Sequence, residues 1–128
     1  MSNILENLYY AKTHEWVSFI NETTARIGIS DFAQHELGDI VFINLPEVGD
    51  NVTAGDAFGD VESVKAVSDI ISPATGVVSA VNQEIIDNPE KINESPYDSW
   101  LIEIEGIDGK SELLTAAGYE EYCGKEAH

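Results

Sequence analysis

The chain has 128 residues, 43% of them apolar and 23% charged, so its length and composition fit one soluble domain with a single hydrophobic core. Twenty-four acidic residues against six basic ones give a net charge of −18, which would repel a nucleic-acid backbone and an anionic membrane surface. No run of 18 apolar residues is present, and the single cysteine, Cys123, excludes an intrachain disulfide. The acidity either serves solubility or steers the protein toward basic patches on partners.

The chain is divided into short segments by glycine, proline and asparagine, which indicates many short strands rather than long helices. Partial alternation of apolar and polar residues marks the strands. The predicted strands cover residues 15–20, 24–29, 40–44, 57–64, 67–72, 76–82 and 100–105.

A short helix is predicted between the second and third of these strands. Ser30 suits its N-cap, Asp31 its first turn and Gly38 its end, while Ala33 and Leu37 lie one turn apart on the face toward the core. The helix is therefore expected to lie at the periphery of the strands.

A second helical segment is predicted to begin near Ser111, to be interrupted at Gly118 and to pack on the sheets as a lid. Its apolar residues are Leu113, Leu114, Ala117 and Tyr122. Short antiparallel strands with these peripheral helices predict an all-β fold, a small β-sandwich or flattened barrel, over residues 1–128.

The segment from Val61 to Ile70 is a mirror image in residue type about the bond between Lys65 and Ala66. Two antiparallel strands joined by a two-residue turn would place the matching residues opposite one another. The predicted pairs are Val64 with Val67, Ser63 with Ser68, Glu62 with Asp69, and Val61 with Ile70. Lys65 is thus expected at the tip of a hairpin, although Lys-Ala lacks the glycine or asparagine that two-residue turns prefer.

Two interpretations of Lys65 follow from the residues alone. It is either an ordinary surface lysine that neutralises Glu62 and Asp69, or an accessible site of covalent modification between the small apolar residues Val64 and Ala66. Acylation would remove its charge and keep a long flexible stem, which suits a swinging arm.

Several motifs, in order along the chain, carry a resemblance to a known family. They are THEWV, ARIGISDFAQ, the run LGDIVFINLPEVGDNVTAGDAFGDVESVKAVSDIISPATGVVSAVN, NPEKIN and SPY. Together they resemble the glycine cleavage H-protein family over about residues 9–122, and ESVKAVSD between Gly49 and Gly76 is the specific part. Two other carrier families place a lysine at such a turn: lipoyl domains of 2-oxoacid dehydrogenases usually read DKA there, and biotin carriers have methionines on both sides of the lysine. Here the flanking residues are Val64 and Ala66, which makes a biotin carrier a poor second choice.

This resemblance implies a lipoyl-domain-like fold with its core at about residues 24–105, and lipoate joined by an amide to Lys65. It implies a carrier with no catalytic and no metal-binding residues of its own. The arm would take an aminomethyl group from a pyridoxal-phosphate glycine decarboxylase to a tetrahydrofolate-dependent aminomethyltransferase. A dihydrolipoyl dehydrogenase with FAD and NAD would receive its electrons, and a lipoate-attaching enzyme would load it.

The resemblance also points to residues around the arm. Glu62, Ser63, Val64 and Ala66 would be recognised together with the lysine. A cleft for the loaded arm would involve Thr13, Glu15 and Asp69, and a carboxylate there could pair with a protonated amine. The alternative is that Glu15 and Asp69 are solvated surface acids. His14 is either structural or functional.

Two other functions remain open at this point: a relay that donates lipoate to other proteins, and an unmodified acidic adaptor. The chain departs from the family between Pro96 and Trp100, where a longer connection with glycine is usual, so a rebuilt loop is expected there. A monomer is expected, with no nucleic-acid or membrane partner. The opening Met1 without a transit peptide favours bacterial cytoplasm, or the mitochondrial matrix for a processed form.

Overall fold

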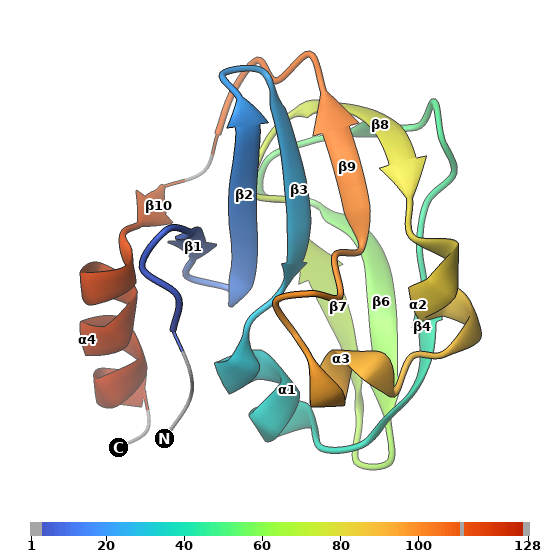
Figure 1. The fold of residues 1–128 in the computed structure, drawn as a ribbon, viewed down its shortest axis with the longest axis vertical. Helices are drawn as coiled ribbons and strands as arrows, with labels where there is room; N and C mark the ends of the chain where they lie inside the picture. Colours follow the sequence, from blue (N-terminus) through green and yellow to red (C-terminus); the bar gives the residue numbers. More distant parts are fainter. Residues whose placement is uncertain (1–3, 111, 127–128) are drawn as a thin grey trace.

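The structure, a computed structural model, describes residues 4–110 and 112–126, with side chains described as far as Cys123 (Figure 1). Its strands are β1 (Tyr9–Ala11), β2 (Glu15–Asn21), β3 (Thr24–Ile29), β4 (Ile40–Asn44), β5 (Asn51–Val52), β6 (Ala57–Ser63), β7 (Val67–Ile71), β8 (Gly76–Val81), β9 (Ile102–Glu105) and β10 (Leu113–Leu114). Its helices are α1 (Asp31–Leu37), α2 (Gln83–Asp87), α3 (Lys91–Glu94) and α4 (Ala116–Glu126).

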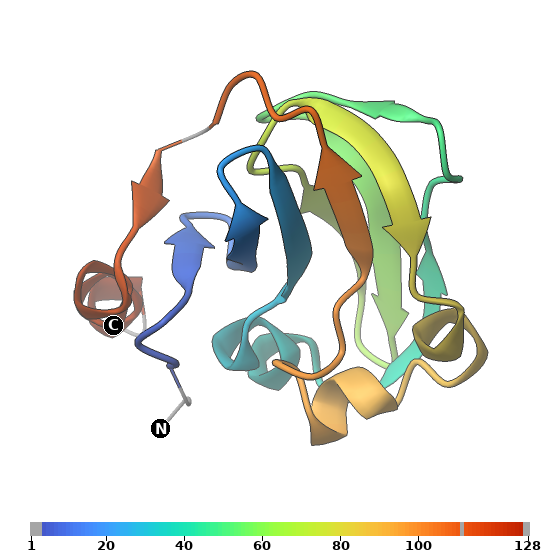
Figure 2. The ribbon, with the colours of Figure 1, turned by 45° about the horizontal axis from the view of Figure 1, so that its top comes forward.

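The strands form two antiparallel sheets that do not close into a barrel. The larger sheet has seven strands in the order β10-β1-β2-β3-β9-β8-β5, and the smaller has three in the order β4-β6-β7. Figures 1 and 2 show α4 with β10 and β1 on one side of the molecule and β4 on the other. The predicted all-β fold is confirmed as an open sandwich.

The core lies between the sheets and extends under the helices. Val61 of β6 and Ile70 of β7 are 1% exposed and pack in one cluster with Ile85 of α2 and Ile92 of α3. A second cluster joins β3, β8 and β9, and a third, rich in aromatic rings, holds α4 against β1 and β2. The smaller sheet and its hairpin are therefore fixed from the inside by aliphatic packing.

The helix after β3 is confirmed with its caps. The Ser30 hydroxyl accepts a hydrogen bond from the Ala33 amide at 3.2 Å. Gly38 ends the helix with φ 78° and ψ −155°, and its own amide donates to the Gln34 carbonyl at 3.0 Å. Ala33 and Leu37 pack against the core cluster as predicted.

The C-terminal segment differs from the prediction. Leu113 and Leu114 form β10, which pairs with β1, and the helix begins only at Ala116; Ser111 lies outside the described residues. The Thr115 hydroxyl accepts a hydrogen bond from the Gly118 amide at 3.2 Å, as an N-cap does. The cap sets the start of α4, so Gly118 lies in its first turn and does not interrupt it. The short elements β1, β5, α2 and α3 were also not predicted.

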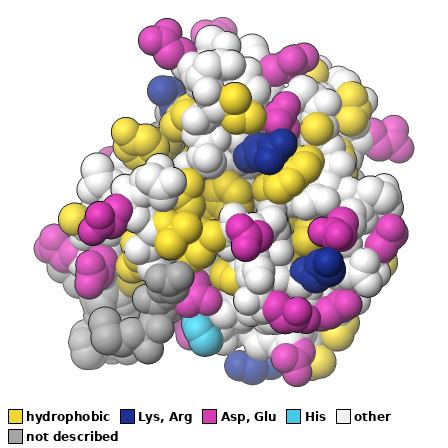
Figure 3. Space-filling view, viewed as in Figure 1, with side chains coloured by type: hydrophobic (Ala, Val, Ile, Leu, Met, Phe, Trp, Pro, Cys, Tyr) yellow, Lys and Arg dark blue, Asp and Glu magenta, His cyan; other side chains and the backbone are white. Residues whose placement is uncertain are grey.

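No helix among the described residues combines the length and apolar character needed to cross a membrane. On the face shown in Figure 3, acidic side chains are spread widely, with few basic ones between them. The strongly negative charge is thus distributed over this surface.

Candidate functional site

The hairpin predicted around Lys65 is present. Strands β6 and β7 pair antiparallel, and the turn between them forms the lower end of the molecule in Figure 1. The Ser63 amide donates to the Ala66 carbonyl at 2.8 Å, which leaves Val64 and Lys65 as the two residues at the tip. The hairpin therefore presents the lysine at its tip.

The register of this hairpin differs from the predicted one by two residues. Asp69 lies opposite Asp60 rather than Glu62, Ser68 lies opposite Val61, and Glu62 lies opposite Val67. The Ser63 hydroxyl accepts hydrogen bonds from the amides of Lys65 at 3.2 Å and Ala66 at 3.1 Å. These hydrogen bonds from the turn backbone to a side chain support a turn that has no glycine or asparagine. They place the centre of the hairpin between Val64 and Lys65 instead of between Lys65 and Ala66.

The side chain of Lys65 is exposed, and its stem lies against Gly38 at the end of α1. No described residue forms a hydrogen bond or ion pair with its amine. The neighbouring side chains of Val64 and Ala66 are also exposed, whereas Glu62 and Ser63 are half-buried. An exposed amine on a flexible stem is accessible to an acylating enzyme.

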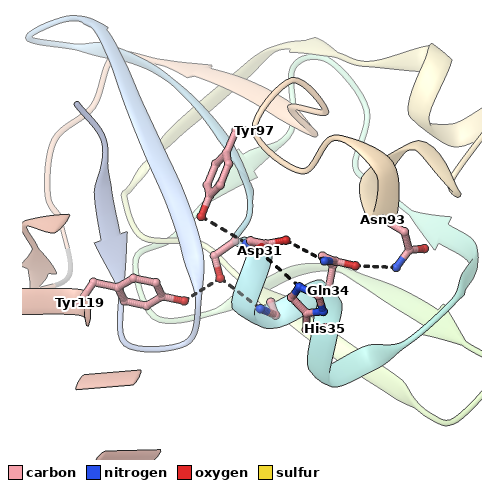
Figure 4. A network of polar contacts seen from close by, with 8 residues as sticks. Asp31, Gln34, His35, Asn93, Tyr97 and Tyr119 are labelled. Carbon is pink, nitrogen blue, oxygen red and sulfur yellow. Dashed lines mark hydrogen bonds and ion pairs between the residues drawn. The ribbon is translucent and has the colours of Figure 1, made fainter. Parts of the chain in front are cut away.

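The segment beside the turn, residues 38–40, is held by a residue that the sequence pattern did not single out, Asn93 of α3. Its Oδ1 accepts from the Ile40 amide at 2.9 Å, and its Nδ2 donates to the Gly38 carbonyl at 2.8 Å and to Gln34 Oε1 at 2.9 Å. Figure 4 shows Asn93 facing Gln34 across the gap between α3 and α1. Asn93 lies in the motif NPEKIN, but nothing in the residue pattern indicated this contact.

A backbone contact links that network to the hairpin. The Val64 amide donates to the carbonyl of Asp39 at 3.0 Å, in the segment that Asn93 holds on both sides. The position of the lysine therefore depends on α1 and α3 as well as on the two strands of the hairpin.

The structure brings two of the three predicted cleft residues together. Glu15 is 2% exposed; the Thr13 hydroxyl donates to its Oε1, and the Ile71 amide of β7 donates to its Oε2 at 3.1 Å. Burial raises the pKa of Glu15 to about 7. Glu15 is thus not the solvated surface acid of the alternative interpretation.

Asp69 lies two residues before Ile71 on β7, and its side chain is exposed. Among the described residues, no hydrogen bond joins its carboxylate to Thr13 or Glu15. A cavity of about 430 Å³ lies beside Thr13 and the end of β7. Its lining residues are Ala11, Lys12, Thr13, Gly55, Ile71, Ser72, Pro73 and Glu112.

His14 has a structural environment. It adopts φ 78°, its Nδ1 lies 2.8 Å from the Tyr119 hydroxyl, and its ring stacks on Phe32 at 4.6 Å. Within the described part of the chain, no group of three His, Cys, Asp or Glu side chains is placed to hold a metal ion.

The comparisons with known proteins agree with this geometry. The family model described as "Glycine cleavage H-protein" matches residues 8–126. A glycine cleavage system H protein of Lachnoclostridium phytofermentans is 55% identical over 123 residues, covering 96% of this chain and 97% of that protein. One of Anoxybacillus flavithermus is 53% identical over 127 residues, covering 97% and 99%.

A solved structure gives the same result for the fold. The crystal structure of a glycine cleavage system H protein from Mycobacterium marinum superposes with a TM-score of 0.86 at 39% identity, covering 98% of this chain and all of that one. The chain therefore belongs to the glycine cleavage H-protein family.

Proposed function

We propose that Lys65 carries a covalently bound lipoyl group and that the protein is the mobile carrier of the glycine cleavage system. The observation that carries the proposal is the exposed Lys65 amine, without a hydrogen-bonding or ionic partner among the described residues, at the tip of a tight hairpin. These residues fit the group, because amide formation needs an accessible amine and the side chain of Lys65 is exposed.

Bound to Lys65, the group would supply a redox-active dithiolane, on which a pyridoxal-phosphate glycine decarboxylase, a tetrahydrofolate-dependent aminomethyltransferase and dihydrolipoyl dehydrogenase would act. The chain itself would catalyse none of these steps. Its contribution is the tether, which raises the local concentration of the arm in the active site of a docked partner.

Glu15 and Thr13 support a second role for the chain, as the resting place of the loaded arm. A carboxylate with a pKa of about 7 exchanges its proton near neutral pH, and a cationic amine placed beside it would favour its ionised form. The cavity next to Thr13 and Ile71 offers space at this point. Asp69, on the outer face of β7, would lie between the Lys65 turn and this cavity along the strand.

The test is the intact mass of the protein purified from its native organism, together with the variant Lys65→Arg. The wild type should show the added mass of one lipoyl group and support exchange of the glycine carboxyl carbon with bicarbonate by the decarboxylase. Lys65→Arg should lack both, and Lys91→Arg, at a half-buried lysine of α3 that pairs with Glu84, should keep both. A native protein with a bare Lys65 would overturn the proposal and favour an unmodified adaptor.

A further inference from the structure

Four of the seven large apolar side chains that the described structure exposes lie around the lysine hairpin. They are Val41, 55% exposed, Phe42, 47%, Val64, 67%, and Val67, 65%. We call these four residues the hairpin patch. Phe42 lies opposite Glu62, and Glu62 lies opposite Val67, so one outward row crosses β4, β6 and β7 directly beside the turn.

A β-bulge creates this patch. Ile40 pairs with Ser63 and Phe42 with Glu62, so Val41 is an extra residue in β4. The bulge lets Ile40 and Ile43 both reach the core while the two consecutive residues between them stay in solvent. Packing of the fold therefore does not account for Val41 and Phe42, and exposed apolar groups clustered at one place indicate a binding surface.

The next outward row on the same face of this sheet is acidic. Asn44 lies opposite Asp60, and Asp60 lies opposite Asp69. Like charges in a cross-strand pair destabilise a sheet. A partner with basic residues beside an apolar site would neutralise this pair when it covers the hairpin patch.

We infer that the hairpin patch is the docking surface for the lipoate-attaching enzyme, and that this enzyme presents an apolar site bordered by basic residues. The inference rests on the proposed function. That enzyme must bring the bare Lys65 amine to an activated carboxyl derivative of lipoate. The amide C–N bond then forms, the activating group leaves with its electron pair, and the amine loses a proton, with no change of oxidation state.

The distance from the turn at which a partner can dock distinguishes this enzyme from the other partners. Enzymes that act on the dithiolane meet the far end of the long arm, so they can dock at a distance from the turn. An enzyme that acylates the lysine has only the lysine stem to reach through, and it must cover the residues immediately around Lys65. The hairpin patch occupies that position.

The experiment measures kcat/KM for lipoylation of the unmodified protein by its attaching enzyme with lipoate and ATP, followed by intact mass. Phe42→Ser and Val41→Ser should each lower kcat/KM at least fivefold, while Phe42→Leu, which keeps the apolar contact, should stay near the wild-type value. Val48→Ser is the matched control, because Val48 is 64% exposed and lies outside the patch. Added salt should lower kcat/KM of the wild type by a larger factor than that of Asp60→Asn, because the variant has lost one of the charges that attract basic residues of the enzyme.

Wild-type protein that gains no lipoyl group would contradict the proposed function itself. Lipoylation of the wild type with an unchanged rate for Phe42→Ser would overturn the docking surface alone. Two further results would also overturn it: normal lipoylation of Phe42→Ser with impaired exchange by glycine decarboxylase, or a wild-type dimer in sedimentation that Phe42→Ser dissociates. Unchanged thermal unfolding of the variants checks that the effects are not due to misfolding.

Discussion

The stem of Lys65 lies against Gly38, so closely that a Cβ added at Gly38 would come 3.1 Å from Cε and 3.7 Å from Nζ of the lysine. Gly38 also has φ 78° and ψ −155°, a combination that glycine alone adopts readily. One residue thus ends α1 and leaves room for the stem of the lysine.

Gly38→Ala should therefore have two effects. The strained backbone should lower the free energy of unfolding by about 1 to 3 kcal/mol, measured by urea denaturation. The new methyl group should also displace the lysine stem and slow lipoylation severalfold.

Gly55→Ala is the control for the second effect. Gly55 has φ 90°, but nothing lies within 4 Å of a Cβ placed there. This variant should lose stability and keep the wild-type lipoylation rate. An equal loss of lipoylation in both variants would show that the contact with Lys65 has no influence.

Asn93→Ala should loosen the segment of residues 38–40, to which the hairpin turn is hydrogen-bonded through Asp39. The change removes three hydrogen bonds, to Ile40, Gly38 and Gln34, and leaves half-buried groups without partners, so a loss of about 2 to 4 kcal/mol is expected. Hydrogen exchange of the Val64 amide, which donates to Asp39, should accelerate beyond the global effect.

The control here is Asn51→Ala, since the Asn51 side chain is exposed and forms no hydrogen bond among the described residues. It should change stability by less than about 0.5 kcal/mol. Protection of the Val64 amide that falls only in step with global stability would show that Asn93 does not position the turn.

The sequence was sufficient to predict the hairpin but not its register. Val61 and Ile70 were predicted to pair; in the structure each has another partner, and both are 1% exposed on the inner face of the hairpin. A slip by two residues leaves every side chain on its own face, so the hydrophobic pattern fits either register equally well. The hydrogen bonds of the Ser63 hydroxyl to the turn amides decide between the two registers, and alternation does not report them.

Only the part of the site formed by residues close together in the sequence was predictable from the residue pattern. Lys65 and its neighbours lie in one continuous segment, and the pattern of that segment identified the hairpin. Glu15 and Ile71 are 56 positions apart, and Asn93 and Ile40 are 53 apart. Contacts over such separations come from the packing of sheets and helices, so Glu15 was indicated by family resemblance and Asn93 was not indicated at all.

The observed register gives a prediction for the acidic pair. Asp69→Asn removes the repulsion between Asp69 and Asp60, so at low salt it should raise the free energy of unfolding by about 0.2 to 1 kcal/mol. The gain should shrink as salt screens the charges. Glu62→Gln, at a residue opposite Val67, is the comparison, and a larger gain in that variant would favour the register predicted from the sequence.

Glu15 should make stability depend on pH in a direction opposite to that of an ion-paired carboxylate. Its pKa rises from an ordinary 4.5 to about 7 in the fold, so between these values the folded state binds a proton that the unfolded state has lost. Stability from this group is therefore present at low pH and lost as the pH rises toward 7, by about 3 kcal/mol in all.

Urea denaturation from pH 4.5 to 8.5, with Glu15→Gln beside the wild type, isolates this contribution from that of the other carboxylates. Glutamine can still accept from the Ile71 amide and bond to Thr13, and it carries no charge to bury. The variant should come closest to the wild type at pH 4.5 and exceed it above pH 8, whereas Glu105→Gln, at an exposed side chain, should differ from the wild type by a nearly constant amount. A constant difference for Glu15→Gln as well would mean that the buried carboxyl group does not titrate with folding. The cleft beside Thr13 would then lack the group proposed to respond to a cationic arm near neutral pH.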